Sequence, residues 1–298
     1  MPGYSHVRAV FTLLAVLCCV SAGEVRAQEE PMQLLFIHHS CGGALLAAPG
    51  PVSGGGRDGG QRCIYASHPN GGDLRSLLTA AGFAVNEASY GSIVGEDTDI
   101  CHWRGKFRDK MDRILHTRLQ DELLPEGLAN EVVVFKSCYP NNGFTGAGAD
   151  PGDPDSCERT VANAKAAYRA LLPEFARRPE VLFVAMTAPP QAEPGPTGLK
   201  GAIKAVFAGR PRSAEWARGF NTWLADSETG WLAGYGTGNV AVFDFYDILT
   251  GHGRSDWSVH PTRDGRDSHP DAEGNRLAAE AFVPFLLQAL ERRGADVR

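Results

Sequence analysis

A serine follows directly on a short apolar run near the start of the chain and precedes two glycines. The segment 36–43 reads Phe-Ile-His-His-Ser-Cys-Gly-Gly, with Ser40 just past the end of the apolar run. A tight turn of this kind presents a hydroxyl to a substrate, but serine is a weak nucleophile unless a base takes its proton. Serine here is also typical of a helix N-cap, so chemistry at Ser40 requires a partner.

A histidine near the other end of the chain is the candidate base. His269 lies in the segment Asp-Ser-His-Pro, residues 267–270, ahead of an amphipathic pattern that predicts a last helix. Neutral imidazole is available near pH 7. Asp267 is placed to orient the ring and to stabilise imidazolium, as the acid of a Ser-His-Asp triad does. Capping of the last helix is the alternative role of His269.

A second His-Pro pair, His260-Pro261, stands nine residues before His269-Pro270. We favour His269 as the base, because the helix that follows it presents apolar residues to a core and thereby fixes the preceding loop. The distance from each imidazole to the serine hydroxyl decides between the two histidines.

Two further residues are candidates for stabilising negative charge. Asn141 follows the apolar run 131–136, and its side-chain amide can donate a hydrogen bond to a developing oxyanion. Gly91 follows the run 83–86, and a glycine lets the backbone N–H approach a ligand closely. Each is also an ordinary turn residue when considered alone.

The elements that position these residues alternate along the chain. Continuous apolar runs predict buried parallel strands, and the segments between them carry helical patterns, so the sequence predicts an α/β fold with right-handed crossovers. The strands are expected over 33–38, 83–86, 131–136, 181–187 and 239–245, and the helices over 73–81, 107–124, 158–176, 214–224 and 272–290.

The segments after the predicted strands are long, while the returns from helix to strand are short. Ligands bind at the carboxyl ends of strands in open α/β sheets, and long loops are often functional. A site is therefore expected at this edge of the sheet. The loops run roughly over 39–72, 88–105, 137–157, 188–212 and 246–270.

The order of these segments resembles the four blocks of the SGNH hydrolases, a division of the GDSL esterase and lipase superfamily. The resemblance spans residues 33–290 and is greatest to members whose first block reads FIHHS and which carry FKSCYPN and DSHP segments. It implies a flavodoxin-like three-layer α/β/α sandwich with a five-stranded parallel sheet. It also implies Ser40 as nucleophile, His269 as base, and an oxyanion hole formed by the Ser40 N–H, the Gly91 N–H and the Asn141 side chain.

The chain departs from the family pattern at two places. Many members carry the acid three residues before the histidine, where this chain has Arg266, while Asp267 lies two and Asp264 five residues before it. The pair His38-His39 replaces the glycine and aspartate of the usual first block. The identity of the acid and the geometry around Ser40 are therefore left for the structure to decide.

The implied activity is that of a carboxylic ester hydrolase, a serine esterase that removes acyl groups from a carbohydrate or another small ester. Candidate substrate contacts on the loops are His39, Tyr139, Asn142 and Trp103, with Phe144 and His102 also able to stack on a sugar ring. Packing beneath the loops is the alternative role of the aromatic residues. The sequence predicts no cofactor. The formal net charge of −6 gives no indication of nucleic-acid binding.

The N-terminus predicts export. The apolar run over 10–20 is too short for a membrane span and is followed by small residues, which is typical of a secretory signal peptide. We expect residues 1–27 to be this signal, residues 28–298 to form a single domain without a stable membrane span, and the protein to be secreted or periplasmic.

Export also changes the expectation for the cysteines. Five remain after the signal, an odd number, so at least one does not pair within the chain. In an oxidising compartment a disulfide between Cys138 and Cys157, which bracket one loop, is plausible.

Two alternatives to the serine esterase remain open. A metal-dependent hydrolase would draw its ligands from His38, His39, His102, Asp97 and Asp99, although no HExxH or CxxC spacing supports it. A non-catalytic carbohydrate-binding protein on a hydrolase-like fold is the second alternative, and the displaced acid at Asp267 is the feature that keeps it open.

Overall fold

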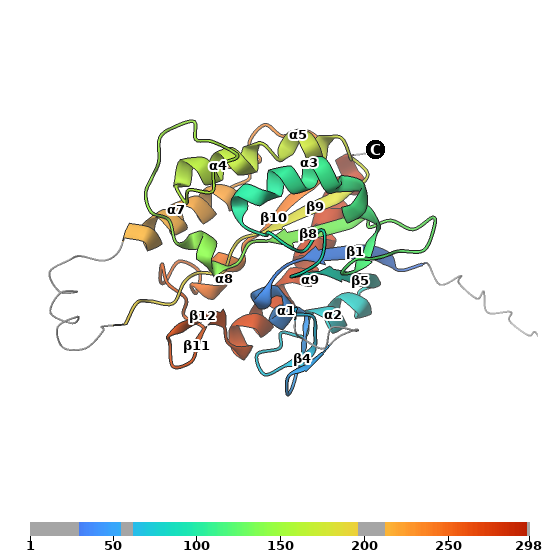
Figure 1. Ribbon diagram of the computed structural model, residues 1–298, viewed down its shortest axis with the longest axis horizontal. Helices are drawn as coiled ribbons and strands as arrows, with labels where there is room; N and C mark the ends of the chain where they lie inside the picture. The colour runs from blue at the N-terminus through green and yellow to red at the C-terminus, as the bar shows by residue number, and fades with distance from the viewer. Residues whose placement is uncertain (1–29, 55–61, 196–211, 297–298) are drawn as a thin grey trace, which may run out of the picture. The chain divides into compact units, whose positions relative to one another are not determined.

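Five parallel strands form the centre of the sheet in the computed structural model, which describes residues 30–54, 62–195 and 212–296. The strands lie in the order β10-β9-β8-β1-β5, each parallel to its neighbours (Figure 1). This is the flavodoxin-like strand order, and the predicted α/β fold with five parallel strands is confirmed. The strands are β1 (Met32–Ile37), β5 (Phe83–Ala88), β8 (Val132–Lys136), β9 (Leu182–Met186) and β10 (Val240–Phe243).

Two short strands extend this sheet to seven. β6 (Thr117–Leu119) lies parallel to the end of β5, and β7 (Glu122–Leu123) returns antiparallel to β6. The prediction of a helix over 107–124 is therefore wrong beyond residue 116. The helix ends before the β-branched Thr117, and Gln120 adopts φ of 56°, which turns the chain tightly between the two strands.

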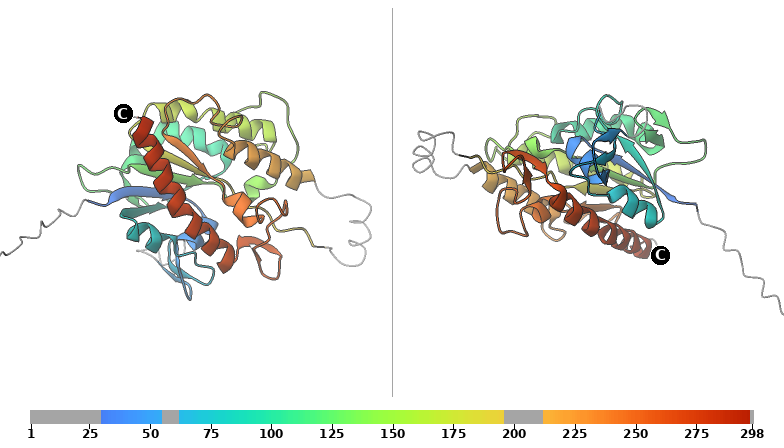
Figure 2. Two further views of the ribbon diagram at one scale, coloured as in Figure 1. Left: turned by 180° about the vertical axis from the view of Figure 1, so that it is seen from behind. Right: turned by 90° about the horizontal axis from the view of Figure 1, so that it is seen from below.

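Alternate residues of the central strands face opposite helical layers, which is why the strands read as continuous apolar runs. In β1, Leu35 and Ile37 pack on one side, while Leu34 and Phe36 pack on the other. Figures 1 and 2 show helices on both faces of the sheet, with α9 crossing one of them. The three-layer sandwich is confirmed. One layer holds α3 (Ile100–His116), α4 (Val161–Arg169), α5 (Leu172–Ala176) and α7 (Arg212–Ala225), and the other holds α1 (Ser40–Leu46), α2 (Leu74–Ala80), α8 (Phe245–Leu249) and α9 (Ala272–Asp296).

The long loops at the carboxyl ends of the strands carry small elements of their own. After β1 and the short helix α1, the chain folds into a three-stranded sheet in the order β2-β4-β3. After β8 comes the short 3₁₀ helix η2 (Tyr139–Asn142), and after β10 and α8 comes the hairpin of β11 and β12. The remaining bounds are β2 (Ala48–Pro49), β3 (Ser53–Gly54), β4 (Tyr65–His68), β11 (Pro261–Thr262) and β12 (Asp267–Pro270).

A disulfide joins Cys101 to Cys157, so the expected pairing of Cys138 with Cys157 is wrong. Cys138 is buried where β8 ends, whereas Cys157 lies in the following loop beside the first turn of α3, which contains Cys101. The bond fastens this loop to the helix. Cys41, Cys63 and Cys138 are free thiols.

Residues Pro31–Arg298 group as one compact unit. The predicted signal peptide, residues 1–27, lies outside the described residues. In the part of the chain that the structure does describe, no helix has both the length and the apolar character needed to cross a bilayer.

Candidate active site

The hydroxyl of Ser40 and the imidazole of His269, 229 residues apart, lie in hydrogen-bonding contact. The Ser40 Oγ to His269 Nε2 distance is 2.9 Å, and His269 Nδ1 lies 2.6 Å from an Asp267 oxygen. A neutral imidazole with its proton on Nδ1 satisfies both contacts, since Nε2 then accepts from the hydroxyl and Nδ1 donates to the carboxylate. The three side chains therefore form a continuous chain of the kind that activates a serine.

The position of Ser40 follows from the topology of the sheet. Ser40 begins α1 directly after β1, and β8 is the strand paired to β1 on the side where the strand order reverses. Ligands of open α/β sheets bind at such a switch point, beyond the carboxyl ends of the strands. The Ser40 hydroxyl is therefore placed where this fold accommodates a substrate.

A tight hairpin brings Asp267 and His269 to the serine. Arg263 and Asp264, both with positive φ, and Gly265 with φ of 85° make the turn between β11 and β12. Asp264 lies within this turn, and Asp267 is the residue that bonds to the His269 ring. The His269 backbone N–H also donates to Asp267, at 3.1 Å, which fixes the carboxylate relative to the ring.

The electrostatics of Asp267 favour its ionised form. Partial burial by itself raises the pKa of this carboxyl, but hydrogen bonds from His269 and the charges of His269 and Arg263 outweigh that effect and lower it below its ordinary value. Arg263 Nε lies 3.4 Å from the second oxygen of Asp267. The carboxylate is thus available to stabilise a cationic imidazole.

His260 occupies a different environment. Its Nδ1 lies 3.5 Å from an oxygen of Asp271, the residue that precedes α9. Its side chain packs so closely on Gly274 that a Cβ at that position would lie 2.7 Å from the His260 Cβ. The second His-Pro pair therefore supports the start of the last helix, while Ser40 bonds to His269.

A cavity of about 270 Å³ opens beside this group of residues. Residues that the sequence analysis missed line it: Tyr65 and His68 of β4, together with Arg263. Burial and the charge of His269 lower the pKa of His68, so a neutral imidazole is favoured there. The His68-Pro69 pair, like the two later His-Pro pairs, is a sequence signal that could have identified this loop.

Tyr139 stays a candidate for substrate contact. It follows β8, is half-buried, and meets the His269 ring edge to face, with the ring centroids 5.1 Å apart. Partial exposure of an aromatic ring beside the imidazole is what stacking on a sugar would require.

His39 was expected to contact substrate, and the structure instead buries it. Its ring stacks on Tyr90, Nε2 donates to the Gly95 carbonyl at 2.9 Å, and Nδ1 accepts from the Thr98 hydroxyl at 3.0 Å. Burial lowers the pKa of His39 to about 4, so the ring is neutral at pH 7, as this pattern of donor and acceptor requires. His39 joins the turn that contains Ser40 to the loop after β5.

His38 also supports the turn that contains Ser40. Its Nδ1 donates to the His39 carbonyl at 2.8 Å, and its Nε2 lies 2.8 Å from Glu87, which also pairs with Arg75. Gly42 packs on this ring, and an added Cβ would lie 2.4 Å from the His38 Cβ. A residue without a side chain is thus required at position 42 for this close approach to His38.

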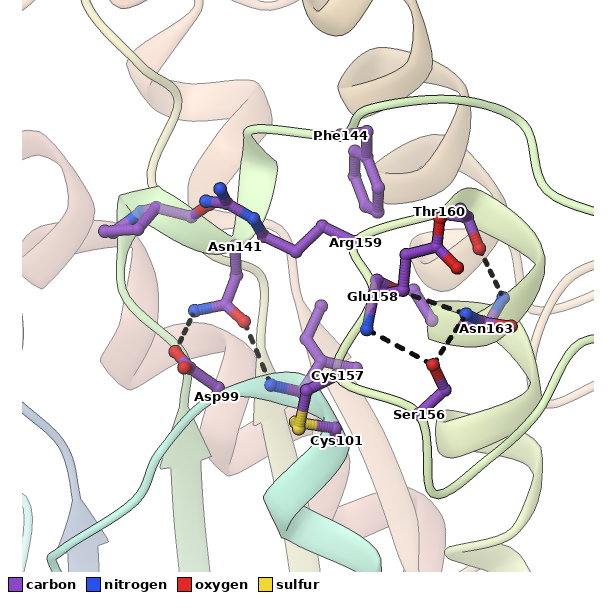
Figure 3. Close-up of a pocket in the computed structure, with 13 residues that line it drawn as sticks. Asp99, Cys101, Asn141, Phe144, Ser156, Cys157, Glu158, Arg159, Thr160 and Asn163 are labelled. Atoms are coloured by element: carbon purple, nitrogen blue, oxygen red, sulfur yellow. Dashed lines mark hydrogen bonds between the residues drawn. A yellow bond between two sulfur atoms is a disulfide. The ribbon is translucent and has the colours of Figure 1, made fainter.

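Asn141, expected in the oxyanion hole, has the polar atoms of its side chain bonded to other groups. Its Nδ2 donates to Asp99 at 2.8 Å and to the Cys138 carbonyl at 3.3 Å, while its Oδ1 accepts from the Ile100 N–H at 2.9 Å. Figure 3 shows the first and third of these bonds at the wall of a separate cavity of about 150 Å³. In this conformation the amide serves the start of α3, because Asn141 supplies the acceptor that the Ile100 N–H lacks within the helix. A role in an oxyanion hole stays a prediction.

Gly91 is also placed differently from the expectation. Its N–H donates to the Glu96 side chain, and its carbonyl accepts from Arg62 at 2.8 Å. The residue is exposed and adopts φ of 72°, so it serves a tight turn that suits glycine. In this conformation its N–H is not directed at Ser40.

Trp103 and Asn142 belong to the interior, so their expected role in substrate contact is wrong. Trp103 is fully buried, donates from Nε1 to Ser137 at 2.8 Å and packs on Phe107 and Phe135. The Asn142 amide donates to two carbonyls of the loop after β9 and accepts from α7. Both residues therefore pack beneath the loops and fix the positions of these loops.

Replacing Asn141 with alanine is expected to lower stability more than turnover. The change removes three hydrogen bonds and leaves the buried Ile100 N–H without its acceptor, which costs about 1–3 kcal/mol. Thermal melting and kcat per folded molecule measure the two effects. Asn86→Ala, which removes another buried amide away from the cleft, is the matched control. A large loss of kcat at unchanged melting temperature would instead support Asn141 as a donor in the oxyanion hole.

The residues proposed as ligands of a metal ion do not form a cluster. In the described segments, the one cluster with suitable spacing is Cys101, His102 and Cys157, and its two sulfurs are bonded to each other. His38 and His39 direct their ring nitrogens to the contacts given above.

Comparison with protein-family models and with curated proteins finds no match. Similar solved structures include a carbohydrate esterase family 2 enzyme with a carbohydrate-binding domain from Corynascus thermopiles (Myceliophthora fergusii), at 14% identity and TM-score 0.41, covering 87% of this chain and 67% of that one. The acetylxylan esterase Axe2 from Geobacillus stearothermophilus is 13% identical, with TM-score 0.43 and coverages of 85% and 93%.

The periplasmic domain of a lipopolysaccharide acetyltransferase from Salmonella ser. Paratyphi A is a third similar structure, at 10% identity and TM-score 0.40, with coverages of 87% and 85%. Since the identities of these three are at most 14% and their TM-scores lie below 0.5, the function of this chain is inferred from its own site.

Proposed function

We propose that the protein is an exported serine ester hydrolase of the SGNH type that removes small acyl groups from a carbohydrate or a similar alcohol. The observation that carries this proposal is the chain of contacts from the Ser40 hydroxyl through His269 to Asp267. A serine, a base within hydrogen-bond reach and a carboxylate that orients the base are the requirements for covalent catalysis of acyl transfer.

The reaction follows from the roles of these groups. Ser40 Oγ attacks the ester carbonyl while His269 Nε2 takes its proton, and Asp267 stabilises the resulting imidazolium. The imidazolium then protonates the departing alcohol, and a water activated by His269 hydrolyses the acyl-enzyme. The backbone N–H of Ser40, in the first turn of α1, lacks an intrahelical acceptor and is the proposed oxyanion donor.

The cleft supports a small acyl group and a polar alcohol. Its volume of about 270 Å³ lies just below the range of ordinary ligand pockets, about 300–1,000 Å³, which suits a small ester. Tyr65, Asn70 and Arg263 line it, and Tyr139 lies against His269. Aromatic faces beside hydrogen-bonding groups suit a sugar ring. An exported location, inferred from residues 1–27, agrees with an extracellular polysaccharide as substrate.

A fluorophosphonate probe is expected to label the wild-type protein at Ser40, because the probe reacts with a serine activated by a base. Labelling should disappear in Ser40→Ala and persist in Ser76→Ala, which removes an exposed hydroxyl on α2. Mass spectrometry of the labelled peptide identifies the serine, and release of acetate from an acetylated xylo-oligosaccharide measures the reaction.

Absence of label from the folded wild-type protein would contradict the proposal. Binding of the oligosaccharide without turnover would then favour a non-catalytic carbohydrate-binding protein.

A further inference from the structure

A second imidazole, that of His68, lines the cavity that contains Ser40 and His269. His68 is the last residue of β4 and is partly exposed, and the reaction derived above gives it no role. A histidine in the wall of a cavity beside the reacting groups is placed to contact a substrate. What it offers to that substrate depends on which ring nitrogen carries the proton.

The backbone next to His68 decides the position of this proton. The Asn70 N–H donates to His68 Nδ1 over 3.0 Å. Because a backbone N–H only donates, Nδ1 acts as the acceptor, and the single proton of the neutral ring lies on Nε2. In the described part of the chain no group accepts a hydrogen bond from Nε2, and the atom is accessible to solvent. His68 therefore presents an N–H donor that a substrate can use.

One buried amide fixes His68 relative to His269. Asn275, which is fully buried in α9, donates from Nδ2 to the Asn70 carbonyl at 2.8 Å and to the Pro270 carbonyl at 3.3 Å. Asn70 is the residue that bonds to the His68 ring, and Pro270 directly follows His269. The two imidazoles are therefore held in the wall of the same cavity at a fixed relative position.

The alcohol part of the ester belongs in this cavity. In the proposed reaction His269 gives its proton to the departing alcohol, so the alcohol oxygen must come within hydrogen-bond reach of His269 Nε2. The rest of the alcohol then extends into the space beside the imidazole, which Tyr65 and His68 line. The Tyr65 ring lies next to the His68 ring, with the centroids 5.0 Å apart, and adds an aromatic surface beside the donor.

We propose that His68 selects the alcohol part of the substrate by donating from Nε2 to the oxygen of a hydroxyl group next to the ester. The substrate class is then a monoester of a vicinal diol, in which the ester oxygen and a free hydroxyl stand on adjacent carbons, as they do on a sugar ring. Both imidazoles line one cavity of about 270 Å³, which favours a short separation between the two oxygens. This inference rests on the proposed esterase function and narrows it.

The kind of bond sets the size of the effect. A hydrogen bond to a neutral hydroxyl contributes a factor of ~3 to 10 in affinity. Since the bond forms in the bound ester as well as in the transition state, its loss should appear mainly in KM. A donor to the developing oxyanion would act differently, because every ester forms that oxyanion, with or without a second hydroxyl. A comparison of two esters therefore separates the two roles.

The test compares the monoacetate of trans-1,2-cyclohexanediol with cyclohexyl acetate, which lacks only the second hydroxyl. Release of acetate gives kcat/KM for each ester, and the ratio of the two values measures the preference for the hydroxyl. We expect the ratio of the wild type to be ~3- to 10-fold higher than that of His68→Ala. His116→Ala, which removes an exposed histidine at the end of α3, is the matched control and should keep the wild-type ratio.

Two further variants separate the donor from the ring. His68→Phe keeps an aromatic ring beside Tyr65 but has no N–H, so it should give the same low ratio as His68→Ala, and it serves in place of that variant if the alanine protein does not fold. His68→Gln carries amide N–H groups at about the reach of Nε2 and should keep part of the preference. Thermal melting of each variant confirms that the measured protein is folded.

Equal ratios in the wild type and in a folded variant without the donor would overturn the inference. The same loss of kcat for both esters would give this result and would assign His68 to the oxyanion instead. Hydrolysis of both esters without dependence on His68 would leave the proposed function intact, whereas a wild-type protein that hydrolysed neither ester would contradict that function and this inference together.

Discussion

Replacing His269 with alanine is expected to lower kcat/KM for ester hydrolysis by at least ~10³-fold. The change removes the acceptor that lies 2.9 Å from Ser40 Oγ, so the hydroxyl loses the base that makes it nucleophilic. Because the side chain is about a third exposed and lies in a cleft, its loss creates no core cavity. Steady-state kinetics with an acetyl ester and a thermal melt measure the two consequences.

His260→Ala is the matched control, because it removes the other imidazole of a nearby His-Pro pair. Its partner is Asp271 at the start of α9, so we expect a modest loss of stability and a kcat/KM within about threefold of the wild type. If His260→Ala abolished turnover while His269→Ala retained it, the base would be assigned to the wrong histidine.

The central sheet could be predicted from the sequence because its strands are buried on both faces. Val132–Phe135, for instance, is continuously apolar because alternate side chains enter two different cores. The edge strands β6 and β7 gave no such signal, since only a few of their residues are covered and their pairing depends on the turn at Gln120. A strand could therefore be predicted from the sequence only where it is long and buried.

The proximity of Ser40 and His269 could be predicted from the order of the segments along the chain. Both residues follow sheet strands, and the carboxyl ends of parallel strands meet at one edge. The role of Asn141 could not be predicted in this way. Its partners, Asp99 and Ile100, come from another loop, and the direction of its amide depends on where α3 begins.

The sequence also did not predict which individual side chains are buried. His39, Asn142 and Trp103 are residue types found at binding sites, and each lies in a long segment predicted to follow a strand. Their polar atoms find partners in neighbouring loops, which is the condition for burying them. The Cys101–Cys157 bond could not be predicted for a related reason, because it joins the first turn of α3 to a distant loop, and their proximity follows from the packing of α3.

Replacing Asp267 with asparagine should lower kcat by about 10²–10⁴-fold with little change in KM. The amide keeps the shape of the carboxylate but carries no charge to stabilise imidazolium, and its NH₂ can hold His269 in the wrong tautomer. Asp264→Asn is the control, since Asp264 lies exposed in the hairpin turn and asparagine tolerates its positive φ. Loss of activity in Asp264→Asn and not in Asp267→Asn would transfer the acid role to residue 264.

The same pair of variants tests the charge of Asp267 through the pH dependence of stability. The folded-state pKa of Asp267 is lowered below its ordinary value of 3.8, so the unfolded chain binds a proton at higher pH than the folded protein does. The stability that this carboxylate contributes is therefore complete above pH 3.8 and is lost as the pH falls through the folded-state value. We expect the melting temperature of the wild type to fall more steeply below pH 4 than that of Asp267→Asn, with Asp264→Asn following the wild type. Parallel curves for all three proteins would mean that Asp267 gains nothing from His269, and the role of the acid in orienting the base would lose its support.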